Sequence, residues 1–227
     1  MVDPGRDSWG RLGADAGMAL TIYGSPRSRT LRVLWMAAEL GLDFELIPLE
    51  WDDPALKTPD YLAVNPAGRV PAIDDGGFRL SESLAINLYL ARKAGSPLYP
   101  ATLEGEARAW SWTQWAIFDL EAPLDNLRRH RLLLPEPERE PAVIAEALRR
   151  IGPALELLER TLAERQWLSG EAFGVADLNV ACVLSPSRTE WLDLGPHAAV
   201  QAWLGRCQGR PAWRAAREAL KKAPLAR

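Results

Sequence analysis

The pattern of hydrophobic residues changes once along the chain, at Gly95-Ser-Pro-Leu-Tyr-Pro100. Before this stretch, short apolar runs typical of strands alternate with segments of helical period; after it, the long segments all have helical period. Glycine and proline are frequent in turns and linkers, so we expect a domain boundary here. The sequence therefore predicts an α/β domain over residues 18–95 and an all-α domain over residues 101–227.

The expected strands and helices of the first domain follow the order β-α-β and then β-β-α. In chain order they are 19–23, 31–41, 44–49, 70–74, 78–80 and 83–92. Asp75-Gly-Gly77 is the expected hairpin turn, and Gly41 is the expected end of the first helix. This order predicts a thioredoxin-like domain.

In the second domain we expect a long helix over 104–130, bent at Pro123. A further helix follows around Leu155, and another begins at Gly174, with Asp177 at its third position. Trp115, Phe118 and Ala122 share one face of the long helix and are expected in the core, whereas Trp112 points elsewhere and is the better candidate for a pocket or dimer contact. Residues 1–17 have no periodicity and no apolar signal core, so they are expected to be a disordered tail.

Composition excludes several classes of protein. The chain has 227 residues, a formal net charge of −3 and no basic block, which gives no footprint for nucleic acid or anionic lipid. It contains no apolar run long enough to span a membrane. Cys182 and Cys207 form neither a CxxC motif nor a metal-binding spacing, so we expect no metal and a cytoplasmic location.

The Val-Pro pair before the third strand and the serine that opens the next helix indicate a binding site. Proline cannot donate to a β ladder, so Pro71 belongs at a strand end, an edge or a bulge. A cis Val70–Pro71 bond would bend the backbone and leave the Val70 main chain available for pairing. Ser83 opens a helix, where free N–H groups and the macrodipole favour an anion. Together these features suit a small peptide that carries a carboxylate.

The motif Asn65-Pro-Ala-Gly-Arg-Val-Pro-Ala-Ile73, followed by Ser81-Glu-Ser-Leu-Ala-Ile86, resembles the glutathione-binding half of the cytosolic glutathione transferases. The resemblance begins upstream at Leu20-Thr-Ile-Tyr-Gly-Ser-Pro and covers residues 18 to 225. It is nearest to the serine-type theta, zeta and phi-like branches. It implies a thioredoxin-like domain followed by an all-helical domain, a homodimer, and glutathione as co-substrate.

The resemblance places the catalytic serine in the loop after the first strand. Ser28 lies four residues before Arg32, the offset of the catalytic serine in related branches, and would donate a hydrogen bond to the glutathione sulfur. A serine here also caps helices very often, so a purely structural role for Ser28 is the alternative. Ser25 is a second candidate. Tyr23 matches the tyrosine that other branches use, but it is expected to pack in the domain. The loop contains no cysteine, which argues against glutaredoxin-like chemistry.

The resemblance also implies which residues hold the tripeptide. Glu82 and Ser83 would bind the γ-glutamyl end, and Val70 beside Pro71 would pair with the cysteinyl main chain. The basic side chains directed toward the glycyl carboxylate would be those of Lys57 and Arg69.

The expected activity is conjugation of the glutathione thiolate to a small hydrophobic electrophile bound between the domains, against the long helix. A glutathione-dependent isomerase or peroxidase on the same fold is one alternative. A non-catalytic binding module is another, against which the intact Glu82–Ser83 pair argues.

Overall fold

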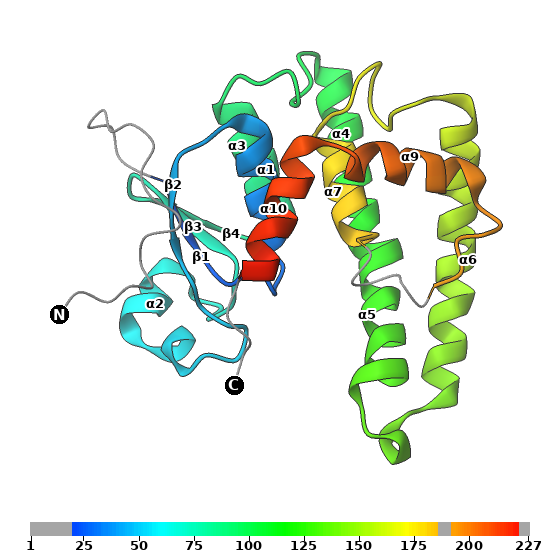
Figure 1. Ribbon diagram of the computed structural model, residues 1–227, viewed down its shortest axis with the longest axis horizontal. Coiled ribbons are helices and arrows are strands. Elements are labelled where there is room, and N and C mark those ends of the chain that lie inside the picture. Colours follow the sequence, from blue (N-terminus) through cyan, green and yellow to red (C-terminus); the bar gives the residue numbers. More distant parts are fainter. Residues whose placement is uncertain (1–19, 186–191, 223–227) are drawn as a thin grey trace. The chain divides into compact units, whose positions relative to one another are not determined.

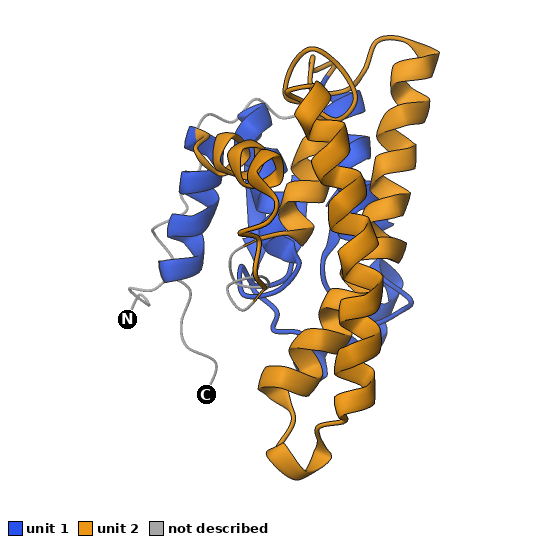
Figure 2. Ribbon diagram, turned by 90° about the vertical axis from the view of Figure 1, so that its right-hand side faces the viewer, with its two compact units in different colours: residues 1–94, 211–227 blue, residues 95–210 orange. Residues whose placement is uncertain are grey.

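The computed structural model describes residues 20–185 and 192–222 (Figure 1). Its contacts divide the chain into two compact units, one formed by 1–94 with 211–227 and the other by 95–210 (Figure 2). The expected division assigned 211–227 to the helical domain, whereas these residues group with the first unit. The expected tail, 1–17, lies outside the described residues.

The first unit contains a four-stranded sheet in the order β2-β1-β3-β4. The strands are β1 (Leu20–Tyr23), β2 (Phe44–Ile47), β3 (Ala72–Asp75) and β4 (Phe78–Ser81). β1 runs parallel to β2 and antiparallel to β3, and β3 runs antiparallel to β4. The predicted thioredoxin-like class is confirmed. β3 begins two residues later than expected, so Val70 and Pro71 precede the strand.

Helices of the first unit pack on this sheet and on each other (Figure 1). They are η1 (Pro54–Lys57, a 3₁₀ turn), α1 (Thr30–Leu40), α2 (Pro59–Val64), α3 (Ser83–Lys93) and α10 (Pro211–Lys222). α1 ends at Gly41 as predicted, because this residue has a left-handed φ of 63° that glycine adopts without strain. α10 packs along α1, and the rings of Trp35 and Trp213 are 4.6 Å apart between centroids.

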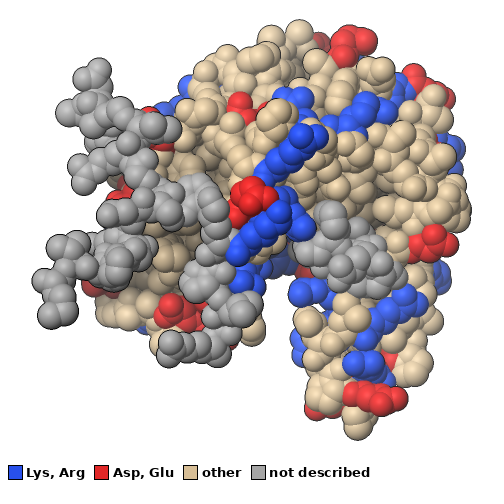
Figure 3. Space-filling view, in the orientation of Figure 1, with Lys and Arg blue, Asp and Glu red and all other residues tan. Residues whose placement is uncertain are grey.

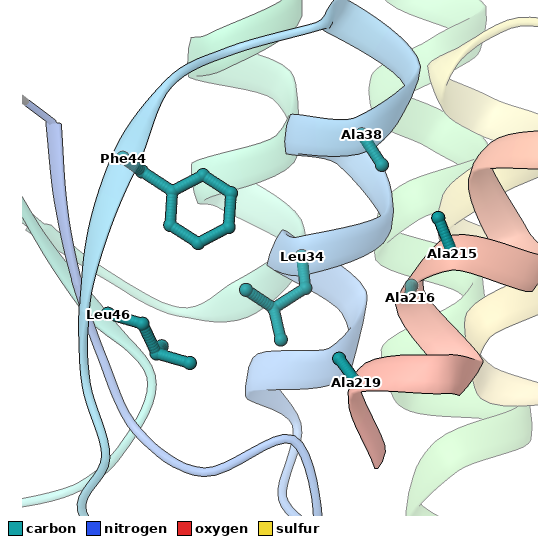
Figure 4. Close-up of a pocket in the computed structure, with 7 residues that line it drawn as sticks. All are labelled: Leu34, Ala38, Phe44, Leu46, Ala215, Ala216 and Ala219. Atoms are coloured by element: carbon teal, nitrogen blue, oxygen red, sulfur yellow. The ribbon is translucent and has the colours of Figure 1, made fainter. Parts of the chain in front are cut away.

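A small apolar pocket of about 80 Å³ remains between α1, β2 and α10 (Figure 4). Its lining consists of Leu34, Ala38, Phe44, Leu46, Ala215, Ala216 and Ala219. None of these side chains donates or accepts a hydrogen bond. The pocket therefore offers nothing to orient a reacting group, and we interpret it as a packing gap left by the alanines of α10.

The second unit is helical throughout its regular elements. Its α-helices are α4 (Leu103–Trp115), α5 (Ala122–Arg128), α6 (Pro141–Glu164), α7 (Val175–Val183) and α9 (Ala198–Gln208). π-helical turns extend over Ala116–Glu121 and Arg129–Leu133, and a 3₁₀ turn lies at Glu136–Glu138. Within the described ranges, no helix is long and apolar enough to cross a membrane.

The predicted irregularity at Pro123 takes the form of the wide π turn before it. A proline ring clashes with the carbonyl four residues earlier and removes one helical hydrogen bond, so the preceding turn widens. Arg150 Nη2 of α6 donates to the carbonyl oxygen of Phe118 over 2.9 Å. The Phe118 side chain is 62% exposed and Ala122 is exposed as well, so the expectation that these two lie in the core is wrong, and Trp115 is half-buried.

A buried carboxylate organises the start of α7. Asp177 accepts hydrogen bonds from the Gly174 N–H (3.1 Å), the Leu168 N–H (3.0 Å) and the indole N–H of Trp203 (2.8 Å). The expected helix start at Gly174, with Asp177 at the third helical position, is therefore confirmed.

Surface charges of both signs are mixed across the face shown in Figure 3. Lys and Arg side chains form a short row over α10, with an acidic group beside them. The sequence of α10 contains Arg214, Arg217, Glu218 and Lys221. This mixture agrees with the small net charge and gives no broad basic surface on this face.

Candidate functional site

Sheet register brings the three predicted site segments to one end of the sheet. Ala72, the first residue of β3, pairs with Tyr23, the last of β1, and with Ser81, the last of β4. The loop 24–28 therefore follows β1, residues 70–71 precede β3, and residues 82–83 follow β4. All three segments lie at the same end of the sheet. A Cβ atom built on Gly24 would lie 3.0 Å from the Val70 Cβ, which shows how closely two of these segments approach.

The main chain at Val70 is held in place by hydrogen bonds to its neighbours, but its own N–H and C=O are unpaired among the described residues. The Val70–Pro71 peptide bond is cis. The preceding carbonyl, that of Arg69, accepts from the Tyr61 hydroxyl and from the Asn65 amide, each over 2.7 Å. Among the described residues, none bonds to the N–H or C=O of Val70. The half-buried Val70 therefore keeps an unpaired N–H and C=O, as expected, and its pairing with an extended peptide stays a prediction.

Tyr61 is a permanent donor to this segment. Burial raises the pKa of its hydroxyl to about 12, and the proximity of Tyr23 acts in the same direction. The hydroxyl therefore keeps its proton at neutral pH and continues to bond the Arg69 carbonyl.

Glu82 and Ser83 lie at the N-terminus of α3, as its cap residue and its first residue. Glu82 is exposed and adopts a φ of 71°, which is uncommon for a residue with a side chain. Ser83 is buried, and its hydroxyl accepts from the Arg32 guanidinium over 3.3 Å. Within the described part of the chain, the Ser83 N–H has no partner. An open N–H, a hydroxyl and a nearby guanidinium at a helix N-terminus suit a carboxylate.

Ser28 lies in the loop between β1 and α1 and is already engaged in local bonds. Its hydroxyl lies 2.8 Å from the Ser25 carbonyl oxygen and 2.8 Å from the Thr30 hydroxyl. It also accepts from the Thr30 N–H over 3.1 Å, which is the structural role considered as the alternative. The side chain is only partly buried, so a ligand can still reach it.

The other two candidates in this loop are less available. The Ser25 side chain is 2% exposed, and its hydroxyl accepts from the Arg27 N–H over 3.2 Å. The Tyr23 ring packs edge-on against Tyr61, with centroids 5.8 Å apart. Both observations favour Ser28 as the hydroxyl that meets a ligand.

Lys57 and Arg69 supply positive charge beside the Val70 segment. The exposed Lys57 ammonium donates to the Gly68 carbonyl over 3.1 Å and has further N–H groups to offer. Arg69 is also exposed, and its guanidinium makes no hydrogen bond or ion pair with any other described residue. Both cations are therefore accessible to an anionic ligand.

Sequence reasoning missed three residues that support this site. Tyr61 and Asn65 hold the Arg69 carbonyl, and Thr30 contacts Ser28. The asparagine belongs to the quoted motif, so its position was a usable signal. Tyr61 and Thr30 have no such signal, because a tyrosine in a short helix and a threonine at a helix start are most often structural.

Chemically, this end of the sheet offers an unpaired peptide main chain, a carboxylate-binding site at a helix N-terminus, surface cations and an accessible hydroxyl. A tripeptide thiol bearing two carboxylates and one ammonium matches this set of groups. A hydroxyl donor beside its sulfur would favour the thiolate, which is the nucleophilic form.

Comparison with known proteins points to one family. The sequence profile of the glutathione S-transferase N-terminal domain matches residues 18–92, and that of the glutathione S-transferase C-terminal domain matches residues 141–220. The chain is 32% identical over 215 residues to glutathione S-transferase PARB of Nicotiana tabacum, covering 90% of this chain and 100% of the relative. It is 34% identical over 205 residues to glutathione S-transferase 3 of Zea mays, covering 86% and 91%.

Solved structures of the family are also similar. The theta-class glutathione S-transferase of Xanthomonas axonopodis pv. citri, solved with glutathione bound, is 31% identical with a TM-score of 0.78, covering 88% of this chain and 97% of that one. Poplar glutathione transferase F1 is 27% identical with a TM-score of 0.82, covering 91% and 100%. The chain belongs to the cytosolic glutathione S-transferase family.

Proposed function

We propose that this chain conjugates the thiolate of glutathione to a small apolar electrophile. The observation that carries the proposal is the register that brings residues 24–28, 70–71 and 82–83 to one end of the sheet. The membership in the family and the similarity to a structure solved with glutathione support the same ligand. Detoxification of electrophiles in the cytoplasm is the physiological role that we propose with it.

In this proposal each end of glutathione has its own partners. The γ-glutamyl carboxylate lies at the Ser83 hydroxyl and N–H, and its ammonium faces Glu82. The cysteinyl main chain pairs with Val70 before Pro71. Lys57 and Arg69 face the glycyl carboxylate. Support comes from the open Val70 main chain and from the exposure of both cations.

Ser28 is the proposed catalytic residue. Its hydroxyl donates to the sulfur and stabilises the thiolate relative to the thiol, while the thiol proton passes to solvent. A free thiol has a pKa of roughly 8.5, and each unit by which it is lowered requires about 1.4 kcal/mol of preferential interaction with the anion. With an aryl halide, the thiolate forms the carbon–sulfur bond and halide leaves with the electrons of the broken bond.

The electrophile is proposed to bind against apolar side chains of the helical unit. Trp110 is 44% exposed and Phe118 is 62% exposed, which provides aromatic surface in α4 and the turn after it. Trp112 and Trp115, packed edge-on with centroids 5.0 Å apart, are part of the same segment. These groups suit a flat, apolar substrate.

A homodimer is proposed as the functional state. Phe78 lies on β4, the edge strand of the sheet, and is 49% exposed although it stacks on Tyr89 at 4.8 Å between centroids. An exposed aromatic ring on an edge strand is suited to contact with a second copy. Light scattering of the wild type and of Phe78→Glu tests this: a dimer that Phe78→Glu weakens is expected, and a wild-type monomer would contradict it.

The test of the activity is conjugation of a generic aryl halide by the wild type and by Ser28→Ala. We expect the variant to retain glutathione affinity and to lose most of kcat/KM at neutral pH. Equal rates for both proteins would remove Ser28 from its role. If the wild type neither conjugates the halide nor is retained on immobilised glutathione, the proposed function itself fails.

A further inference from the structure

The Ser28 hydroxyl has three polar contacts but only one proton. Its oxygen lies 2.8 Å from the Ser25 carbonyl and 2.8 Å from the Thr30 hydroxyl, and it receives the Thr30 N–H over 3.1 Å. A carbonyl oxygen can only accept, so the contact with Ser25 requires the proton of Ser28. The contact with Thr30 then requires the proton of the Thr30 hydroxyl. Only this assignment satisfies every contact of both side chains.

The Thr30 hydroxyl is held in this position by packing. Thr30 is fully buried. A Cβ atom built on Gly24 would lie 2.0 Å from the Thr30 Oγ1, so any side chain at Gly24 would displace that hydroxyl. Gly24 itself has a φ of 130°, which favours glycine for a second reason. The absence of a side chain at Gly24 thus leaves room for the Thr30 hydroxyl to contact Ser28.

From these contacts we infer that Thr30 is a positioning residue for glutathione activation. It donates to the Ser28 oxygen, so the proton of Ser28 is directed away from Thr30 and can turn from the Ser25 carbonyl to the ligand. The inference rests on the proposed function, in which Ser28 donates to the sulfur, and it assigns a role to a residue that does not itself touch the substrate.

Binding of glutathione then requires only a rotation of the Ser28 O–H bond. The proton leaves the Ser25 carbonyl and turns to the sulfur, since a hydrogen bond to an anion is roughly twice as strong as one to a neutral acceptor. The Ser25 carbonyl keeps the Ser28 N–H as donor at 3.0 Å, so it does not lose its last partner. Meanwhile the donation from Thr30 polarises the Ser28 hydroxyl and strengthens its bond to the thiolate.

Variants of the full-length protein test this role. Thr30→Val removes the hydroxyl and keeps the branched shape, Thr30→Ser keeps the hydroxyl, and Thr161→Val is the control. The Thr161 hydroxyl donates to the Leu157 carbonyl of its own helix over 2.9 Å, so the control removes one threonine hydroxyl and its hydrogen bond in the other unit. The primary readout is the pKa of the bound glutathione thiol, which is measured from the ultraviolet absorbance of the thiolate across pH. The second is kcat/KM for the aryl halide at a pH below that pKa.

We expect Thr30→Val to raise the bound-thiol pKa and to lower kcat/KM about two- to tenfold, as for the loss of one hydrogen bond. KM for glutathione should change little. Thr30→Ser and Thr161→Val should match the wild type. In a Ser28→Ala background, Thr30→Val should have no further effect, because Thr30 acts only through Ser28.

Two results would overturn the inference: a wild-type thiol pKa in Thr30→Val, or an equal loss of kcat/KM from Thr30→Val with and without Ser28. Failure of the proposed function is distinct, because then the wild type and Ser28→Ala would already have the same bound-thiol pKa.

A measurement on the wild type covers the case in which Thr30→Val does not fold. In a crystal structure with glutathione, the Ser28 oxygen should lie within hydrogen-bond distance of both the sulfur and the Thr30 oxygen. A Ser28 side chain that reaches the sulfur only by leaving Thr30 would contradict the inference.

Discussion

The guanidinium of Arg32 donates to the hydroxyl of Ser83 over 3.3 Å, and both side chains are buried, at 5% and 4% exposure. The pair connects α1 to the first residue of α3, across 51 positions of sequence. Because Arg32 occupies the Ser83 oxygen as a donor, the Ser83 proton stays available for an acceptor. The arrangement places the positive charge of Arg32 close to the N-terminus of α3, which already favours an anion through its macrodipole.

Replacement of Arg32 should therefore weaken glutathione binding as well as the fold. We expect Arg32→Met to lower the glutathione affinity about 10- to 100-fold, since hydrogen bonds to charged groups contribute about 1.5–3 kcal/mol and about 1.4 kcal/mol is a factor of ten. Arg32→Lys keeps the charge and should lose less. Calorimetric titration with glutathione measures both. An unchanged affinity in Arg32→Met would show that the pair is only structural.

The variants Glu82→Gly and Glu82→Ala should distinguish the effect of backbone strain on stability from the effect of the carboxylate on glutathione binding. Glu82 has a φ of 71°, and a residue with a side chain in such a region costs roughly 1–3 kcal/mol. Both variants remove the carboxylate proposed to face the γ-glutamyl ammonium, so both should bind glutathione more weakly. Only Glu82→Gly relieves the backbone, so it should unfold at higher denaturant concentration than Glu82→Ala. Equal midpoints would mean that the backbone there is not strained.

Loss of the Tyr61 hydroxyl should affect the position of Val70. Tyr61→Phe removes one of two donors to the Arg69 carbonyl and should lower the free energy of unfolding by about 1 kcal/mol. Asn65→Ala should cost more, because the Asn65 side chain also accepts from the Ala67 N–H over 3.1 Å. Denaturant unfolding checks the order of the two. If Tyr61→Phe is the more damaging variant, the account of this segment is wrong.

The buried Asp177 predicts a specific pH dependence of stability. Burial raises the pKa of its carboxyl to about 6, from 3.8, against the opposing effect of its donors, of which the Trp203 indole has the largest. A group whose folded pKa is raised contributes most to stability below its unfolded pKa and loses that contribution as pH rises through the folded value. The free energy of unfolding of the wild type, relative to Asp177→Asn, should therefore fall between about pH 4 and pH 6 and stay constant above.

The expected size of this fall is roughly 3 kcal/mol, at about 1.4 kcal/mol per pKa unit. Urea unfolding of both proteins across this range provides the measurement. A rise over the same window would mean that the N–H donors outweigh burial and hold the carboxylate ionised.

Local sequence was sufficient for the strands, for α1 and α3 and for the motif that surrounds Val70 and Ser83, but not for η1 and α2. The turn at Gly41 and the cap at Asp177 follow from residue types at fixed offsets, so they were predictable. The exposure of Phe118 was not, because a helical face shows which residues lie together and not what covers them. Nor was the Thr30–Ser28 contact, which depends on room left by Gly24. The Arg32–Ser83 pair joins distant segments, and single-sequence periodicity carries no information on such a contact.

A crystal structure of the wild type with glutathione tests the central claim most directly. We predict the cysteinyl main chain paired with Val70, the γ-glutamyl carboxylate at Ser83 and the sulfur about 3 Å from the Ser28 oxygen. Glutathione bound elsewhere, or with its sulfur against Tyr23 or Ser25, would contradict the assignment.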